Sequence, residues 1–249
     1  MFSVLGKIFQ KRSLIVGTVT VLFVLLLTSV YVFSAQIHGD AQYHEILTRQ
    51  ILQSGWPLTE DHFTIMSFAA DGSPHYAPVN YPEGAYLLYA GFLKIGTVAL
   101  QFSSSLFAGL IALIVFLFLR PFGDRIAAAG AGAAIIFNMR RFIMSPILEQ
   151  PLLAASMATA LFLALWLEKA RMRYAIAAGV CAGIAMSIKQ QGLLIGPICG
   201  AVALIVLLLK QSSGKRKKIL IQAAGALGVA LLVTMPFQIE HLQRNGTIG

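Results

Sequence analysis

Asp40 and His44 stand four residues apart in a stretch that follows the first long apolar run of the chain. Residues at this spacing share one face of a helix, and no helix breaker occurs before Gly55-Trp56-Pro57. A carboxylate at a helix start, on a lipid–water boundary, stays ionised at neutral pH. It can then take a proton from an incoming hydroxyl as a general base. Asp40 is therefore a candidate catalytic residue, and His44 is a candidate substrate-binding residue beside it.

Both residues also have a purely structural interpretation. Asp40 is in position to cap the N-terminus of a helix, where a carboxylate accepts backbone N–H bonds and meets the positive end of the helix dipole. This role is compatible with catalysis. His44 could equally be a polar residue of the membrane interface.

A second group of candidates lies further along the chain. Glu149 stands between Pro146 and Pro151, at the expected start of a helix, where the dipole alone would favour an acid. Arg140, Arg141 and Lys189 flank apolar segments, and a cation there can hold a phosphate. The structural alternatives are that the two arginines mark the end of a span and that Lys189 extends from a helix end to the interface.

The composition indicates that these residues belong to a membrane protein. The 249 residues are 57% hydrophobic and 12% charged, with a mean hydropathy of +0.77, whereas soluble domains carry about a quarter charged residues. The net charge of +9 does not indicate nucleic-acid binding, because the basic residues lie between apolar runs. Cys181 and Cys199 lie within apolar runs and are expected to be packing residues.

The apolar runs predict an all-α, polytopic membrane protein with about seven transmembrane helices in a single module, 1–249. The first run, with roughly 20 apolar residues, is too long for the h-region of a signal peptide and matches an uncleaved span. The expected spans are 13–35, 97–119, 126–139, 152–167, 175–188, 193–209 and 219–239.

The loops between these spans alternate in charge. The positive-inside rule places the N-terminus and the loops 120–125, 168–174 and 210–218 in the cytoplasm, and with them 13 of the 19 Lys and Arg residues. The loops 36–96 and 140–151 then face outward. Six of the 10 acidic residues lie in the first outer loop, so this loop is the expected location of the chemistry.

The first outer loop has an internal pattern of its own. Tyr43, Ile46, Leu47 and Ile51 recur at helical spacing, which predicts an amphipathic helix over 40–54 lying on the membrane surface. The polar, Gly- and Pro-containing segment 57–78 is expected to form an ordered flap. A new helix begins near Tyr81-Pro82, and its apolar residues 85–95 either re-enter the membrane or begin the second span.

These motifs resemble the C-type membrane glycosyltransferase superfamily, whose members use dolichyl- or polyprenyl-phosphate sugars. The similarity lies in Gly39-Asp40-Ala41-Gln42-Tyr43-His44-Glu45 followed by Gly55-Trp56-Pro57, in Tyr81-Pro82 before the second span, in Glu149 at the start of the fourth, and in Lys189 after the fifth. The seven-span layout is similar to the N-terminal module of the family. Many members have Asp-Glu where this chain has Asp40-Ala41, and many continue with further spans.

The resemblance implies a transfer of sugar from a polyprenyl-phosphate donor to an acceptor hydroxyl on the extracytoplasmic face of the inner or plasma membrane. Asp40 would be the base, and Glu149 would orient the acceptor or a metal. Lys189, Arg140 and Arg141 would bind the donor phosphate, with His44 and Tyr81 also on the substrate. The acceptor would be a glycan, lipid or protein. Some members need a divalent cation such as Mg or Mn, but the chain has no clear Asp-x-Asp, so no metal ligand is assigned.

Two other functions remain open from the sequence. The chain could be a non-catalytic or truncated member of the same architecture, or one half of a split enzyme whose second subunit supplies a C-terminal part. A transporter of small solutes or lipids is less favoured, because the spans carry no central Asp or Glu and show no internal repeat.

Overall fold

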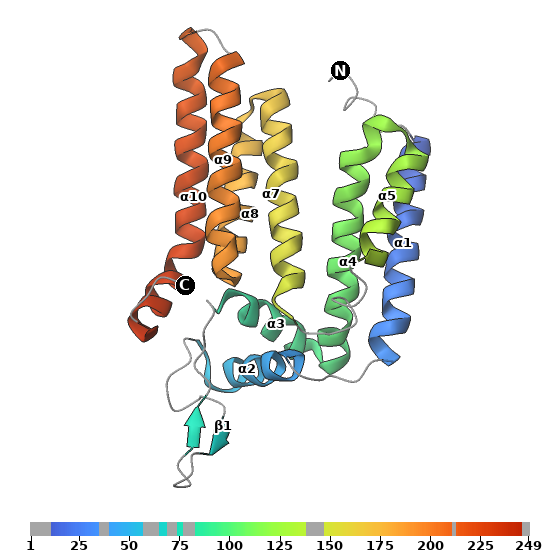
Figure 1. Cartoon of the computed structure of the whole chain (residues 1–249), viewed down its shortest axis with the longest axis vertical. Coiled ribbons are helices and arrows are strands. Elements are labelled where there is room, and N and C mark those ends of the chain that lie inside the picture. Colours follow the sequence, from blue (N-terminus) through green and yellow to red (C-terminus); the bar gives the residue numbers. More distant parts are fainter. Residues whose placement is uncertain are drawn as a thin grey trace.

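The structure, a computed structural model, describes residues 11–34, 40–56, 65–68, 74–76, 83–137, 147–210 and 213–245. It is a bundle of helices with one small hairpin (Figure 1). The elements are α1 (Lys11–Ser34), α2 (Asp40–Ser54), β1 (Ile65–Phe68), β2 (Pro74–Tyr76), α3 (Gly84–Ile95), α4 (Thr97–Leu119), the 3-10 helix η3 (Arg120–Phe122), α5 (Asp124–Phe137), α7 (Glu149–Lys169), α8 (Met172–Ile188), α9 (Gln190–Lys210) and α10 (Ser213–Asn245).

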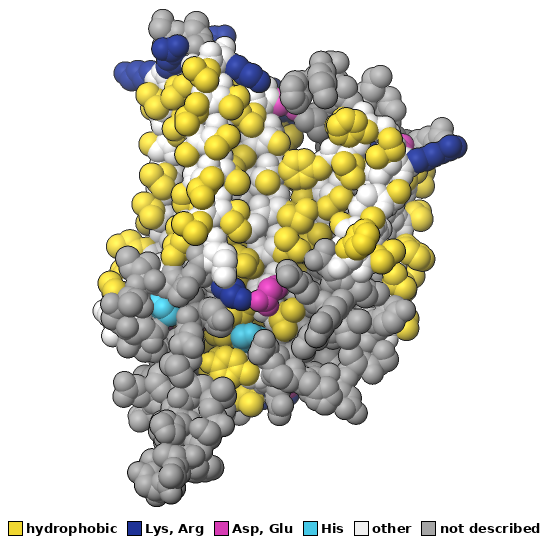
Figure 2. Space-filling model, viewed as in Figure 1, with side chains coloured by type: hydrophobic (Ala, Val, Ile, Leu, Met, Phe, Trp, Pro, Cys, Tyr) yellow, Lys and Arg dark blue, Asp and Glu magenta, His cyan; other side chains and the backbone are white. Residues whose placement is uncertain are grey.

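The long helices form two groups that stand side by side. α7, α8, α9 and α10 make one group, and α1, α4 and α5 make the other, with α4 in contact with α7 (Figure 1). α2 and α3 run across the lower end of the bundle, and the hairpin lies beyond them. Lys and Arg side chains gather at the opposite, upper end, while apolar side chains cover the faces of the helices (Figure 2). We call the lower end, with α2 and α3, the site end, and the upper end, with the Lys and Arg side chains, the basic end.

The prediction of a helical membrane protein is confirmed, but the count of seven spans stays a prediction. Among the described residues, five helices are long and apolar enough to cross a bilayer: α1, α4, α7, α9 and α10. The third and fifth predicted spans correspond to α5 and α8, which have 14 and 17 residues. At 1.5 Å per residue these reach about 21 and 25 Å, less than the hydrocarbon thickness of about 30 Å.

The first outer loop contains more structure than the sequence predicted. β1 and β2 pair antiparallel, with Ile65 opposite Tyr76, inside the segment expected to be a flap. α3 is a separate helix and not the start of α4, because Gly96 between them adopts φ 152°, which interrupts the helix. The predicted amphipathic helix forms at the expected residues, as α2.

α2 packs its buried face against α3. Its buried residues are His44, Leu47, Thr48 and Ile51, at the i, i+3, i+4, i+7 spacing of one helix face. Leu47 and Ile51 form one core cluster with Tyr86, Tyr89 and Leu93 of α3, and Leu100 and Leu148 extend this cluster into α4 and toward α7. Protein therefore covers the inner face of α2, and its position on the membrane surface stays a prediction.

At the basic end of the α7–α10 group, buried hydrogen bonds link α7 to α10. The indole N–H of Trp166 donates to Gln222 Oε1 at 2.7 Å, and Gln222 Nε2 donates to the carbonyl of Ala170 at 3.0 Å. Ala170 ends α7 in the left-handed conformation, with φ 47°. Gln222 of α10 thus satisfies a terminal carbonyl of α7 that would otherwise lack a partner.

The backbone of α8 lies in direct contact with the backbone of α10. A Cβ added at Gly179 would clash with the carbonyl group of Ala226 on α10. Small residues that let helix backbones approach this closely are the usual basis of helix packing in lipid, where no hydrophobic force draws helices together. Gly179 therefore sets the distance between α8 and α10.

We expect Gly179→Ala to lower the free energy of unfolding by about 1–3 kcal/mol, because the added methyl must push the two backbones apart. Gly228→Ala on α10 is the matched control, since a Cβ there meets nothing within 4 Å. It should be neutral or stabilising by up to about 1 kcal/mol, through helix propensity alone. Thermal unfolding of both variants in detergent measures the difference. Equal melting temperatures for the two variants would show that Gly179 does not set the spacing.

Candidate active site

The structure brings Glu149 and Lys189 together at the site end of the bundle. Lys189 Nζ donates to Glu149 Oε1 at 2.6 Å. Glu149 is the first residue of α7, where the positive end of the helix dipole favours a carboxylate. Lys189 lies between the last residue of α8 and the first residue of α9. The two side chains are 36% and 16% exposed, so the pair lies at the surface of the bundle with the lysine more deeply buried.

Two glycines hold the segment that carries Lys189. A Cβ at Gly192 would clash with the carbonyl group of Ala185, so the turn from α8 into α9 closes only without a side chain there. A Cβ at Gly84 would lie 2.6 Å from the carbonyl oxygen of Ser187, so the start of α3 lies directly against the end of α8. Lys189 is thus fixed between α8, α9 and α3.

His44, a predicted substrate residue on α2, lies in the region of this pair. Its Nδ1 lies 3.0 Å from the Tyr86 hydroxyl, and both side chains are buried. It lies close enough to Glu149 for an electrostatic interaction with that carboxylate, which also interacts with Lys189. α2, α3, α7 and the α8–α9 turn therefore each contribute a polar group to the same region.

A network of buried hydrogen bonds supports the start of α7. The Tyr89 hydroxyl donates to the carbonyl of Ile147 at 2.7 Å, and Ser104 Oγ donates to Gln150 Oε1 at 2.7 Å. Tyr89 and Gln150 also meet, at 3.4 Å. Burial raises the pKa of the Tyr89 phenol well above its ordinary value, and the charge of Glu149 adds to this effect. The phenol therefore remains a donor and holds the residues that precede Glu149.

Sequence reasoning missed these supporting residues. Tyr86, Tyr89, Ser104 and Gln150 lie in apolar helices and match no motif. Glu83, which the sequence placed at the start of a new helix after Tyr81-Pro82, is fully buried there, at the start of α3. A buried carboxyl group needs hydrogen bonds or a compensating charge, and the only signal for Glu83 in the sequence is its place directly before an apolar helix.

For four of the predicted site residues the side chain is not described. Tyr81, Arg140 and Arg141 lie outside the described residues. Asp40 is the first residue of α2, as predicted, but only its backbone is described. It precedes His44 by one turn, which places the two on the same face of α2. Among the described residues, no group of three or more His, Cys, Asp or Glu could hold a metal ion.

In the described part of the chain, five apolar helices long enough to cross a bilayer define an integral membrane protein. Residues 81–239, more than half of the chain, match the model of the dolichyl-phosphate-mannose-protein mannosyltransferase family, and the chain belongs to that family. This confirms the resemblance to the C-type superfamily of membrane glycosyltransferases, which use polyprenyl-phosphate sugars. No curated protein and no solved structure gave a significant match.

The match divides the predicted site. Glu149 and Lys189 lie within the matched residues, as do Tyr81, Arg140 and Arg141, whereas Asp40 and His44 precede them. The family match therefore covers α3 to α9, most of α10 and both residues of the ion pair. α2 lies outside the match and packs on α3.

We expect the Glu149–Lys189 pair to contribute measurably to stability, because Lys189 is mostly buried. A double-mutant cycle with Glu149→Gln and Lys189→Gln should give a coupling of about 1 kcal/mol, the upper end for partly exposed pairs. The Glu45–Arg49 pair of α2 is the control: its atoms also lie 2.6 Å apart, but the Arg49 side chain is 46% exposed. Its coupling should be near zero, and a Glu149–Lys189 coupling no larger than this would contradict the expectation.

Proposed function

We propose that this protein transfers a sugar from a polyprenyl-phosphate donor to an acceptor hydroxyl at the extracytoplasmic face of the membrane. The observation that carries the proposal is the Lys189–Glu149 pair, which places a held ammonium group at the end of the bundle opposite the basic end. The positive-inside rule puts the basic end in the cytoplasm, so the pair would face outward. Family membership supplies the donor class.

Lys189 is the proposed ligand of the donor phosphate. An ammonium group carries three N–H donors, so Lys189 can bridge the Glu149 carboxylate and a phosphate oxygen. Glu149 would hold the ammonium in place while the negative charge on the phosphate grows. A positioned cation is most valuable at that moment, because the charge develops as the bond to the sugar breaks. Arg140, Arg141 and Tyr81 are proposed to complete this part of the site.

Asp40 is the proposed general base. The acceptor oxygen forms a bond to the anomeric carbon, its proton passes to the Asp40 carboxylate, and the polyprenyl phosphate leaves with the electron pair of the broken bond. The place of Asp40 at the start of α2 supports this role, since α2 also carries His44 to the region of Glu149. His44, held by Tyr86, is proposed to contact the substrate from the same face.

An apolar cavity offers room for part of the polyprenyl tail. It has a volume of about 320 Å³ and lies among α7, α8, α9 and α10. Its lining consists mainly of Ala, Gly and Leu, and it includes Met186 and Gly196, which lie three residues before and seven residues after Lys189. A donor whose phosphate is bound by Lys189 could therefore place the first isoprene units in this cavity, which we call the small-residue cavity.

Asp40→Asn should lower the turnover number by about 10²–10⁴-fold, the contribution of a general base, without changing the amount of protein in the membrane. The assay is the release of free polyprenyl phosphate from a panel of polyprenyl-phosphate sugars, beginning with mannose, in membranes that contain the full chain. Glu45→Gln is the matched control on α2 and should retain activity. Full activity of Asp40→Asn would refute its role, and an inactive wild-type chain would favour a non-catalytic member of the family.

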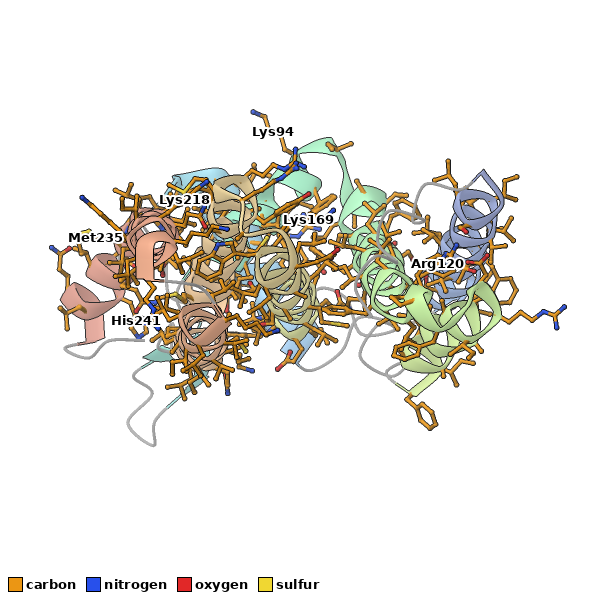
Figure 3. The ribbon with its side chains drawn as sticks, turned by 90° about the horizontal axis from the view of Figure 1, so that it is seen from above. Lys94, Arg120, Lys169, Lys218, Met235 and His241 are labelled. Carbon is orange, nitrogen blue, oxygen red and sulfur yellow. The ribbon has the colours of Figure 1, made fainter. Side chains whose placement is uncertain are left out.

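Lys189→Gln should lower kcat/KM for the donor by about 10- to 100-fold, the effect of losing a charge-assisted hydrogen bond. Both the KM for the donor and kcat should change, because the contact strengthens as the phosphate leaves. Lys94→Gln is the control at the same end of the molecule, since Lys94 is exposed on α3 and points away from the bundle (Figure 3). Equal effects of the two substitutions would indicate a general loss of surface charge and no specific phosphate contact.

A further inference from the structure

A second apolar cavity lies toward the basic end, away from the candidate active site. It has a volume of about 530 Å³ and lies between α1, α4 and α7, a size within the range of ligand-binding pockets. We call it the basic-end cavity. Its apolar walls include Leu14, Leu22, Phe116, Leu117, Leu161 and Leu165.

The basic-end cavity opens sideways toward the bilayer. Leu14 and Leu22 of α1, which line it, are 61% and 51% exposed. Because α1, α4 and α7 are all long enough to span a membrane, the opening lies at the depth of the lipid chains. An apolar hollow left empty there would forfeit van der Waals contacts on one side. Lipid hydrocarbon is the neighbour available to fill it.

The mouth of the cavity is polar and cationic. Ser13, Arg120, Lys169 and Tyr174 line it along with the apolar residues. Seen from the basic end, Arg120 lies with the α1, α4 and α5 group and Lys169 with the α7–α10 group (Figure 3). The polar groups of the mouth therefore come from both halves of the bundle.

In the described part of the chain, two cations near this mouth are not neutralised by carboxylates: Lys169, which lines the mouth, and Arg173, which contacts Tyr174 of the same lining. Arg120 is paired with Asp124, at 2.5 Å between Nε and Oδ1, and donates to Ser13. Lys169 and Arg173 instead lie over the Tyr174 ring, 5.6 and 4.8 Å from its centroid. Among the described residues, neither of these two forms an ion pair.

The surroundings reinforce this positive charge. Among the described residues of the basic end, the acids are Asp124 and Glu168, whereas twelve residues are Lys or Arg. The twelve are Lys11, Arg12, Arg120, Arg125, Lys169, Arg171, Arg173, Lys210, Lys215, Arg216, Lys217 and Lys218. Basic pockets between helices on the cytoplasmic side are suited to anionic lipid headgroups.

We propose that the basic-end cavity binds one anionic phospholipid. An acyl chain fills the space between α1, α4 and α7, and the headgroup phosphate binds Lys169 and Arg173 beside the Tyr174 hydroxyl. A zwitterionic lipid carries its own ammonium group, so the cations at the mouth select against it. The site is separate from the proposed donor site, because Lys189 lies at the other end of the bundle. The bound lipid joins the two helix groups where an apolar gap would otherwise separate them.

Native mass spectrometry of the full chain, titrated with phosphatidylglycerol, phosphatidylcholine or a polyprenyl phosphate, tests the proposal. The wild type should retain one phosphatidylglycerol and prefer it at least tenfold over phosphatidylcholine. Lys169→Ala should weaken phosphatidylglycerol binding by about fivefold, as expected for one cation near a membrane surface. Leu161→Trp should also weaken phosphatidylglycerol binding, because the larger side chain takes up part of the cavity.

Matched controls lie on α9 at the same end. Lys210→Ala removes an exposed cation that does not line the cavity, and Leu209→Trp adds the same bulk at a side chain that is 78% exposed. Neither should change binding. Equal retention of phosphatidylcholine, or unchanged binding in Lys169→Ala and Leu161→Trp, would overturn the proposal. So would displacement of phosphatidylglycerol by polyprenyl phosphate with loss of that binding in Leu161→Trp, because the cavity would then belong to the donor lipid.

Discussion

The close approach of α8 to its neighbours is the constraint on which the remaining structure depends. α8 has only 17 residues, and its backbone is met directly by α10 at Gly179, by the start of α9 at Gly192 and by the start of α3 at Gly84. In lipid such backbone contacts replace the hydrophobic force that packs soluble helices. They fix the end of α8, and α7 packs along α8 as well. The contact between Lys189 and Glu149 follows from this close packing.

The two ends of the bundle carry opposite kinds of polar organisation. At the site end, polar side chains from α2, α3, α4 and α7 are buried and joined by specific hydrogen bonds, such as those of Tyr89 and Gln150. At the basic end, cations gather at the surface around an open apolar cavity. Buried and satisfied polar groups hold a fixed geometry, which suits a reaction. An exposed basic rim provides attraction to anions with little positional demand.

Much of the fold could be predicted from the sequence, because the length and composition of an apolar run identify a membrane helix. α2 forms at the residues that its breakers and periodicity indicated, and α7 begins at Glu149, between the two prolines that marked its start. The expected third span, 126–139, was as short as α5 is. Whether 85–95 formed a separate helix was left open by the sequence, because the separation of α3 from α4 depends on a local break, φ 152° at Gly96, which hydropathy averages out.

The sequence identified single residues of the candidate site but not the contacts between them. Glu149 and Lys189 were each identified from their position at a span end, but they are 40 residues apart and nothing in the sequence pairs them. Tyr89, Ser104 and Gln150 gave no signal, because a single polar residue in an apolar helix has many possible partners. Their hydrogen bonds span 46 to 61 residues, and only the packing of α3, α4 and α7 determines them.

The contact of Gln222 with Trp166 and Ala170 has a consequence for biosynthesis. Trp166 and Ala170 precede Gln222 by 56 and 52 residues in the chain. The N-terminal parts of a protein are synthesised first. α7 therefore leaves the ribosome with a terminal carbonyl and an indole N–H that water or lipid headgroups must satisfy until α10 arrives. Insertion of α10 removes both groups from that polar environment in one step, so α10 completes the assembly of α7, which is made before it.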